Sequence, residues 1–323
     1  MLTAYLFDRS EGRRVEAWPE ALRDLSKNQV LWVDLVAASP GEEPAVREVF
    51  GLEDGSSAPG SLRKAGVDQH PGYLAVTAIA VSDEEEDAER EMVVVDCFVG
   101  PNWVLTVHEA EIAVIEDFKG LASGEGELGD LDAPSFLSAL LEWVIGSYMH
   151  AFDEIETRLE EFDIEVLSSA SRETDAQIET LIAARRRVGR LRRSLSPHRD
   201  VFTALGHTEF DPLSSESSSE RFVELTARLD AALASAREVK DAIASSFDVL
   251  IVRTEHRTNE IVKVLTLASI LLLPGTLIAG VLGMNINFSA SAFVTSAVFW
   301  TGVVGIVAVA SATFGFARAR RWI

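Results

Sequence analysis

The chain has 323 residues, of which 47% are hydrophobic, and a formal net charge of -22. Every acidic residue precedes position 264, so the leading part alone carries about -25, and such an acidic surface repels nucleic acid and attracts cations. The single cysteine, Cys97, excludes a disulfide framework within the chain. The first residues lack the basic and apolar regions of a cleaved signal, so we expect none.

The sequence predicts an α/β domain over residues 1–132. Short runs rich in Val, Ile, Leu and aromatic residues predict five strands, at residues 4–8, 30–36, 73–82, 92–99 and 103–108. Helical spacing predicts helices at residues 18–28 and 42–50. The acidic segment 83–91 joins two predicted strands, and we interpret it as a solvated hairpin tip in preference to a metal site.

From residue 133 the strand pattern gives way to helical periodicity. We predict a helical hairpin over residues 133–213, with helices at residues 136–169 and 174–205. Acidic residues crowd the second half of the first helix, and the second helix carries seven arginines. We therefore expect the two helices to be antiparallel partners of opposite charge. Nucleic-acid binding by the arginines is disfavoured, because the cluster lacks aromatic residues on which bases could stack.

A stalk helix is predicted over residues 214–263, and it continues into the hydrophobic region that follows. Ser217 and Glu220 fit a capping box at its start. Apolar residues then recur at steps of three and four, as in a coiled coil. This seam consists of Phe222, Leu225, Leu229, Ala232, Ala236, Val239 and Ile243. A helix of about 65 residues needs partners, so we expect a homo-oligomer with the seam near its axis.

The C-terminal region resembles a membrane hairpin. No charged residue and no histidine lies between Lys263 and Arg318, and roughly 20 apolar residues suffice to cross a bilayer core. We predict transmembrane helices at residues 264–282 and 292–317, joined by an external loop at 283–291. Basic residues flank both spans and form the tail 318–323. The positive-inside rule therefore predicts a multi-pass protein of the cell (inner or plasma) membrane with both termini in the cytoplasm.

One face of the first predicted span mixes small, polar and apolar side chains. This mixed stripe consists of Asn259, Val262, Leu265, Ser269, Leu273, Thr276 and Gly280, which recur at steps of three and four. A helix-packing face and the wall of a pore both fit this composition. Pro274 lacks an N–H, so we expect a kink near the middle of the span.

Several motifs resemble those of the CorA family of divalent-cation channels. Gly283, Met284 and Asn285 form a Gly-Met-Asn sequence at the outer end of the first span. Other resembling segments are Thr258-Asn259-Glu260, Ile278-Ala279-Gly280, Trp32-Val33-Asp34-Leu35, Phe50-Gly51-Leu52, residues 102–108 and Leu191-Arg192-Arg193. The resemblance implies an α+β membrane protein that assembles as a homopentamer, with a cytoplasmic α/β domain, a long helical stalk and two C-terminal transmembrane helices.

The same resemblance implies roles for individual residues. Gly283, Met284 and Asn285 would form the selectivity filter, the mixed stripe would line the pore, and Leu265 and Leu273 would form an apolar constriction. Neutral amide oxygens suit a hydrated Mg²⁺ ion, which gives up its water reluctantly. Glu224 and Asp248 fall at positions where the family has acids that bind a regulatory cation. The implied protein passes hydrated divalent cations, Mg²⁺ first and also Co²⁺ or Ni²⁺, and closes when cytoplasmic cations bind.

Two departures from the family pattern leave the ion open. Leu282 stands where the family usually has Tyr, and the loop after Asn285 lacks acidic residues. Alternatives are therefore a transporter of Zn²⁺ or another transition metal, and a membrane-tethered cation sensor. We predict no enzyme and no organic cofactor, since the sequence has no nucleophile–base set, phosphate loop or zinc-ligand spacing. The expected partners are further copies of the chain, lipid and divalent cations, with no nucleic acid.

Overall fold

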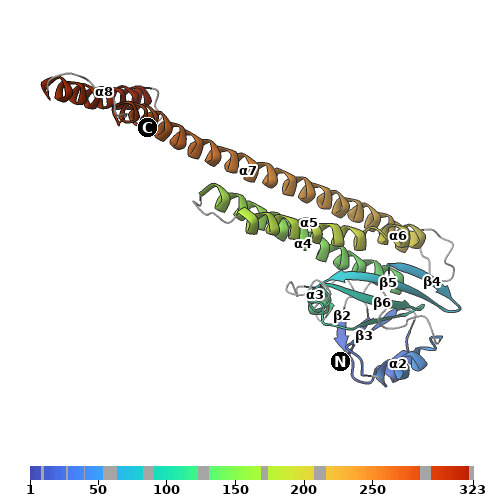
Figure 1. Cartoon of the computed structure of the whole chain (residues 1–323). Helices are drawn as coiled ribbons and strands as arrows, with labels where there is room; N and C mark the ends of the chain where they lie inside the picture. The colour runs from blue at the N-terminus through green and yellow to red at the C-terminus, as the bar shows by residue number, and fades with distance from the viewer. Residues whose placement is uncertain are drawn as a thin grey trace. The chain divides into compact units, whose positions relative to one another are not determined.

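The computed structural model in Figure 1 describes residues 1–8, 11–26, 28–39, 41–53, 64–82, 91–122, 131–168, 174–206, 216–283 and 292–319. These residues belong to two compact units. The first unit consists of Met1–Glu165 and Ala170–Phe247, and the second of Val166–Ser169 and Asp248–Ile323.

The first unit contains a seven-stranded sheet of order β2-β1-β3-β7-β6-β5-β4. Its strands are β1 (Leu2–Asp8), β2 (Glu11–Arg14), β3 (Gln29–Val36), β4 (Gly66–His70), β5 (Tyr73–Val81), β6 (Met92–Val99) and β7 (Trp103–His108). Neighbouring strands are antiparallel except for β3 and β7, which are parallel. The five predicted strands are confirmed. The two outermost strands, β2 and β4, escape prediction because their short sequences are largely polar.

Helices cover both faces of the sheet. On one face, α1 (Trp18–Arg23) and α2 (Glu42–Phe50) pack through stacked Trp18 and Phe50 rings, whose centroids are 5.5 Å apart. On the other face, Phe118 of α3 (Ala113–Ala122) and Phe136 of α4 (Ala133–Ser168) contact the fully buried Trp32. The predicted α/β domain is confirmed, although α1 ends five residues earlier than the predicted 18–28 and α3 was not predicted.

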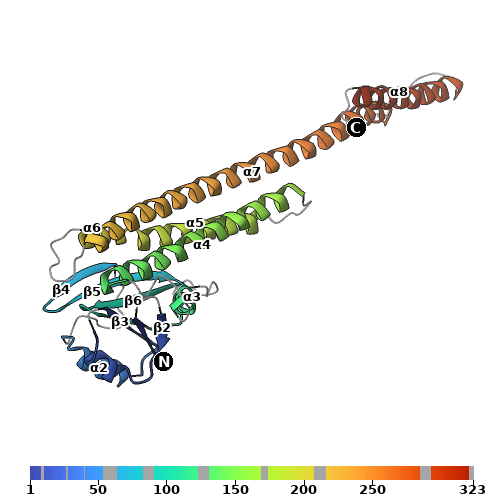
Figure 2. The same cartoon turned by 180° about the vertical axis from the view of Figure 1, so that it is seen from behind.

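The remaining helices are α5 (Thr174–Leu195), α6 (His198–Gly206), α7 (Glu216–Gly283) and α8 (Ala292–Ala319). Figures 1 and 2 both show α4 and α5 side by side along the first part of α7. The prediction of one helix over 174–205 is wrong. The chain turns at Ser196 and Pro197 before α6 begins, because proline has no N–H to continue the helix. The prediction of one unbroken helix from the stalk to the Gly-Met-Asn motif is confirmed.

The seam on α7 is covered by the chain itself. All seven of its residues, from Phe222 to Ile243, are at most 3% exposed in the single chain. On α4, Asp163 accepts a hydrogen bond of 3.1 Å from Ser246, and Glu142 lies 2.6 Å from Arg228 of α7. The expectation that this seam lies near the axis of a homo-oligomer is therefore wrong. Periodicity identifies an apolar face, but it does not say which helix covers that face.

Side chains of the helical layer complete the hydrogen bonding of β5. Among the described residues, strand β4 pairs with β5 as far as Thr77, and no strand pairs with the next residues of β5 on that side. The Ile79 N–H donates to Nε2 of His198 at 3.1 Å, and Tyr148 donates to the Ile79 carbonyl at 2.9 Å. The Val81 N–H donates to Ser147 at 3.0 Å. These bonds fix α4 and α6 to the sheet.

The predicted charge pairing between the acidic and arginine-rich helices is present, but its main acid is Glu91, which directly precedes β6. Glu91, only 3% exposed, lies 2.5 Å from Nε of Arg187 and 2.9 Å from Nη2 of Arg190. Glu154 of α4 lies 3.4 Å from Arg187. The prediction of a solvated tip is therefore wrong for Glu91, while residues 83–90 lie outside the described part of the chain.

Candidate functional site

The mixed stripe predicted from the sequence is exposed on the second unit. Its seven residues, Asn259, Val262, Leu265, Ser269, Leu273, Thr276 and Gly280, all lie on α7 and are all exposed in the single chain. Leu265 and Leu273 are each 66% exposed, although both side chains are wholly apolar. Large apolar side chains left in this state need either lipid or another protein surface.

The opposite face of α7 is the one that packs on α8. A Cβ atom added at Gly275 would lie 3.7 Å from Cγ2 of Ile306. Leu267, Gly275 and Ile278 are half-buried, whereas Ala268, Thr276 and Leu277 are exposed. With 3.6 residues per turn, this face is centred roughly opposite the mixed stripe. The chain's own second hydrophobic helix therefore leaves the stripe uncovered.

The hydroxyl groups of the stripe have their protons bonded within the helix. Ser269 donates to the Leu265 carbonyl, and Thr276 donates to the Leu272 carbonyl, each at 2.9 Å. A hydroxyl oxygen bonded in this way keeps its lone pairs as acceptors. The stripe therefore offers acceptor oxygens, separated along the helix by the apolar side chain of Leu273. This arrangement suits a cation that is surrounded by its own water, because that water presents O–H donors.

The Gly-Met-Asn motif begins where α7 ends. Gly283 is the last residue of the helix. Met284 and Asn285 lie outside the described residues, so the predicted selectivity filter remains a prediction. Among the described residues, α7 is the one helix long and apolar enough to cross a membrane, and the apolar part of α8, Phe299–Gly315, is shorter. The second predicted span therefore also remains a prediction.

The predicted regulatory acids lie far apart on α7 among the described residues, and their role remains a prediction. Both Glu224 and Asp248 are exposed, and Glu224 lies 3.7 Å from Arg228. They are 24 residues apart on α7, which at 1.5 Å per residue is about 36 Å. The described residues contain no group of three or more His, Cys, Asp or Glu side chains suited to a metal ion.

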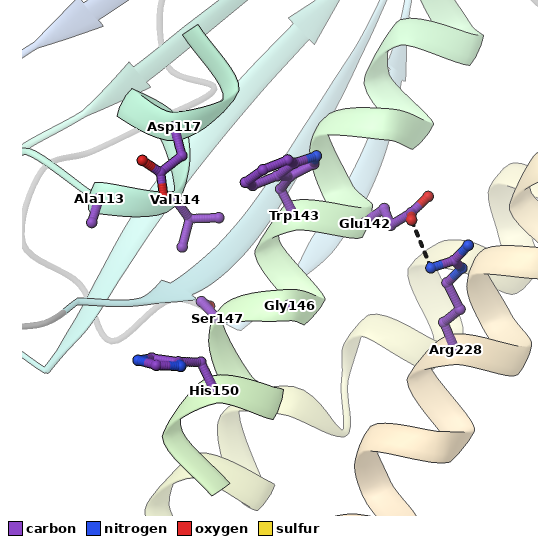
Figure 3. Close-up of a pocket in the computed structure, with 9 residues that line it drawn as sticks. All are labelled: Ala113, Val114, Asp117, Glu142, Trp143, Gly146, Ser147, His150 and Arg228. Carbon is purple, nitrogen blue, oxygen red and sulfur yellow. Dashed lines mark ion pairs between the residues drawn. The ribbon is translucent and has the colours of Figure 1, made fainter. Parts of the chain in front are cut away.

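A surface pocket of about 510 Å³ lies between α3, α4 and α7, and sequence reasoning missed it. Figure 3 shows Asp117 of α3 facing Trp143 and His150 of α4 across the pocket. Glu142 and Arg228 form an ion pair at its edge, 2.6 Å apart. This pair links α4 to α7.

Two of the motifs that carry the family resemblance meet in the core. Asp34 of β3 is wholly buried and lies 3.1 Å from Nε2 of His108 and 2.8 Å from Nζ of Lys119. It also accepts a hydrogen bond from Thr106, which in turn accepts one from Trp32 at 3.0 Å. Burial alone would raise the pKa of Asp34, but His108 and Lys119 hold the pKa below its ordinary value. These motif residues therefore form a buried hydrogen-bond network that links the parallel strands β3 and β7.

Comparison with known proteins adds independent information. The family model described as CorA-like Mg²⁺ transporter protein matches residues 27–318. The cobalt/magnesium transport protein CorA of Thermotoga maritima is 25% identical over 156 residues, which cover 48% of this chain and 43% of that protein. The chain thus spans less than half the length of this relative. The divalent cation transporter CmaX of Pseudomonas aeruginosa is 23% identical over 320 residues, covering 98% of this chain and 94% of that protein.

Solved structures show the same fold over the whole chain. The complete structure of the CorA magnesium transporter from Methanocaldococcus jannaschii has a TM-score of 0.77 and 18% identity, and covers 100% of this chain and 99% of that one. The full-length CmaX structure has a TM-score of 0.69 and 20% identity, with 99% and 97% covered. At these identities the likeness establishes the fold alone.

Proposed function

Because the chain belongs to the family of CorA-like Mg²⁺ transporters, we propose that it forms a homopentameric membrane channel for hydrated divalent cations. Mg²⁺ is the first candidate, followed by Co²⁺ and Ni²⁺. In this proposal α7 and α8 supply the spans 264–282 and 292–317, and the α/β domain and both termini lie in the cytoplasm. The family consists of ion transporters, and the chain is not an enzyme.

One observation carries the proposal: the mixed stripe is uncovered and lies opposite the face of α7 that packs on α8. If the stripe faced lipid, the acceptor oxygens of Ser269 and Thr276, which lie within the proposed span 264–282, would be in hydrocarbon without a donor, which is costly. If several copies surround a central path, the same oxygens meet water and hydrated ions. The cyclic assembly therefore accounts for both the polarity and the exposure of the stripe.

The stripe also supports a proposal for how the path opens and closes. Leu265 and Leu273 are eight residues apart, about two helical turns, with Ser269 midway between them. Rings of leucine at these two levels would expel water when the path narrows, and an apolar constriction that dries in this way blocks ions. A small outward movement of α7 would widen the path at both leucine rings, so that water and ions could enter.

The outer filter is proposed at Asn285, two residues beyond the end of α7, with Gly283 and Met284 supporting it. Five amide oxygens could accept hydrogen bonds from the water around Mg²⁺ without displacing that water. Regulation by cytoplasmic Mg²⁺ at Glu224 and Asp248 remains a prediction. The described part of one chain brings no group of three or more such ligands together, and in this proposal a neighbouring copy supplies further groups.

The test is ion flux into liposomes that contain the purified full-length chain. The wild type should take up Mg²⁺, and Asn285→Ala should change which of Mg²⁺, Co²⁺, Ni²⁺ and Zn²⁺ passes. The matched control is Asn102→Ala, an amide removed from the α/β domain, which should leave the ion preference unchanged. An Asn285→Ala protein with wild-type uptake of all four ions would contradict the filter.

Two alternatives predict different outcomes in the same assay. Uptake of Zn²⁺ without Mg²⁺, driven by a pH gradient, would favour a Zn²⁺ or other transition-metal transporter, which Leu282 and the non-acidic loop leave open. The hydrophobic region has no His or Cys ligand, and this favours a hydrated hard ion instead. No flux of any ion would favour a membrane-tethered cation sensor, for which the mixed stripe would be unnecessary.

A further inference from the structure

Four arginines form an exposed stripe along α5. Arg185, Arg186, Arg192 and Arg193 are all exposed and occur as two pairs seven residues apart, about two helical turns, so they share one face. Across the described ranges, no ion pair engages these four side chains, whereas the intervening Arg187 and Arg190 both pair with Glu91. The basic stripe therefore carries unpaired positive charge in a chain whose net charge is -22.

A complementary acidic stripe runs along α4. Asp153, Glu156, Glu160 and Glu161 are all exposed and also recur within two helical turns on one face. No ion pair involves any of these four in the part of the chain that the structure describes. The chain thus carries two opposite, unpaired charged faces on neighbouring helices, and no ion pair connects them within the described residues.

The two stripes overlap in part along the helix pair, at the level of Arg185 and Arg186, whereas Arg192 and Arg193 lie beyond the end of the acidic stripe. The contact of 3.4 Å between Arg187 and Glu154 sets the antiparallel register of α5 against α4. In that register Arg185 and Arg186 stand beside the level of Glu156. A cyclic assembly around an axis parallel to these helices would keep all copies at the same height. Rotation around such an axis can therefore place the basic stripe of one copy against the acidic stripe of the next.

We propose that the basic stripe on α5 docks on the acidic stripe on α4 of the neighbouring copy. This contact is heterologous, meaning that each copy contributes a different face to each of its two neighbours, and such contacts form a ring when the rotation between copies closes. The inference rests on the proposed oligomer and specifies how its subunits recognise one another. Charge complementarity favours this partner over an anionic membrane or a nucleic acid, because a phosphate surface would also meet the acidic remainder of the chain.

A cysteine cross-link tests the contact directly in the full-length protein. Two differently tagged versions, one with Arg186→Cys and the other with Glu156→Cys, are co-expressed, purified together and treated with a short bismaleimide. We expect a cross-linked species that carries both tags. The control pair replaces Glu156→Cys with Glu20→Cys, an exposed residue of α1, and should give no such species. The natural Cys97 is buried and gives the background in the unmodified chain.

Charge reversal provides the second measurement. Replacing the four arginines by Glu should raise the protein concentration at which the oligomer dissociates by about tenfold, since each exposed pair contributes modestly. Reversing the acidic stripe to Arg in the same chain should restore the wild-type value. An intact wild-type oligomer that gives no cross-link would overturn the docking while leaving the channel proposal standing, whereas a wild-type chain that is monomeric in bilayers would overturn both. Vesicle binding that needs anionic lipid and the four arginines, without a cross-link, would assign the stripe to lipid.

Discussion

Each half of α7 has a face whose residues recur at steps of three and four. One face is buried in the single chain, and the other is exposed. In the first half, the seam from Phe222 to Ile243 is uniformly apolar and is at most 3% exposed in one chain. In the second half, every residue of the mixed stripe from Asn259 to Gly280 is exposed. The first half has α4 and α5 beside it, whereas α8 packs on the opposite face of the second half. Steps of three and four therefore identify a face, and side-chain chemistry decides its partner.

The difference follows from what each face can gain by burial. Apolar side chains are stabilised by any dry apolar cover, so the seam is satisfied by the chain's own helices. A face that mixes leucines with hydroxyl and amide groups gains less from such a cover, because its acceptors also need donors. In the proposed assembly, a water-accessible path between copies would supply the donors. The comparison predicts that mutations in the seam should alter stability, whereas mutations in the stripe should alter transport.

The largest effect is expected for Leu229→Ala in the seam. Leu229 is 0% exposed, so its truncation removes buried contacts and leaves a cavity, which should lower the free energy of unfolding by about 4 kcal/mol. Denaturant unfolding of the full-length protein in detergent measures this loss. The control is Val223→Ala on the same helix, where the side chain is 64% exposed and the change should stay within about 0.5 kcal/mol. Equal losses for the two variants would contradict an intrachain seam.

The attachment of α6 to the sheet should weaken in acid through His198. Burial lowers the pKa of His198 from 6.5 to about 4, although its bonds to the Leu195 and Ser194 backbone oppose the shift. The folded chain therefore binds fewer protons than the unfolded chain between these values. Stability is complete above about pH 6.5 and falls by about 3 kcal/mol as the pH drops to about 4. Unfolding of wild type and His198→Asn across this range measures the difference, and parallel pH profiles would exclude His198 as the cause.

In the mixed stripe we expect the opposite pattern, with transport affected and stability unchanged. Thr276→Val replaces a ring of acceptor oxygens with methyl groups and should lower Mg²⁺ flux roughly tenfold. The matched control is Thr301→Val on α8, because both hydroxyls donate to the carbonyl four residues earlier, at 2.9 and 2.7 Å. The control should retain wild-type flux, and both variants should unfold within about 0.5 kcal/mol of wild type. Equal flux in both variants would remove the stripe from the path.

Much of the fold could be predicted because its signals are local. The Val-rich runs of β3, β5, β6 and β7 and the break-free pattern of α7 need only the spacing of neighbouring residues. The missed strands, β2 and β4, are short polar edges that take their structure from the neighbour with which they pair. The break at Pro197 was visible in the sequence, and the continuous pattern of apolar residues on both sides concealed it.

The residues of the candidate site could be predicted from the sequence, but their surroundings could be predicted only in part. The stripe can be recognised in the sequence because polar residues interrupt an otherwise apolar span. Its position opposite α8 follows from the contact between Gly275 and α8, which the sequence does not reveal. Likewise, the acidic segment ending at Glu91 looks solvated in sequence, since the arginines that bury it lie nearly 100 residues away. Long-range partners of this kind follow from topology, which one sequence does not contain.

The smallest effect on the free energy of unfolding is expected for the exposed ion pairs of Arg228, beside the seam. Arg228 lies 2.6 Å from Glu142 and 3.7 Å from Glu224, and its side chain is 53% exposed. Water competes for such pairs, so Arg228→Leu should lower the free energy of unfolding by less than about 1 kcal/mol, and added salt should shrink the loss. Mg²⁺ flux should be unchanged. A loss as large as that of Leu229→Ala would mean that ion pairs, and not apolar packing, fasten α4 to α7, and the contrast between the two halves of the helix would then have a different physical origin.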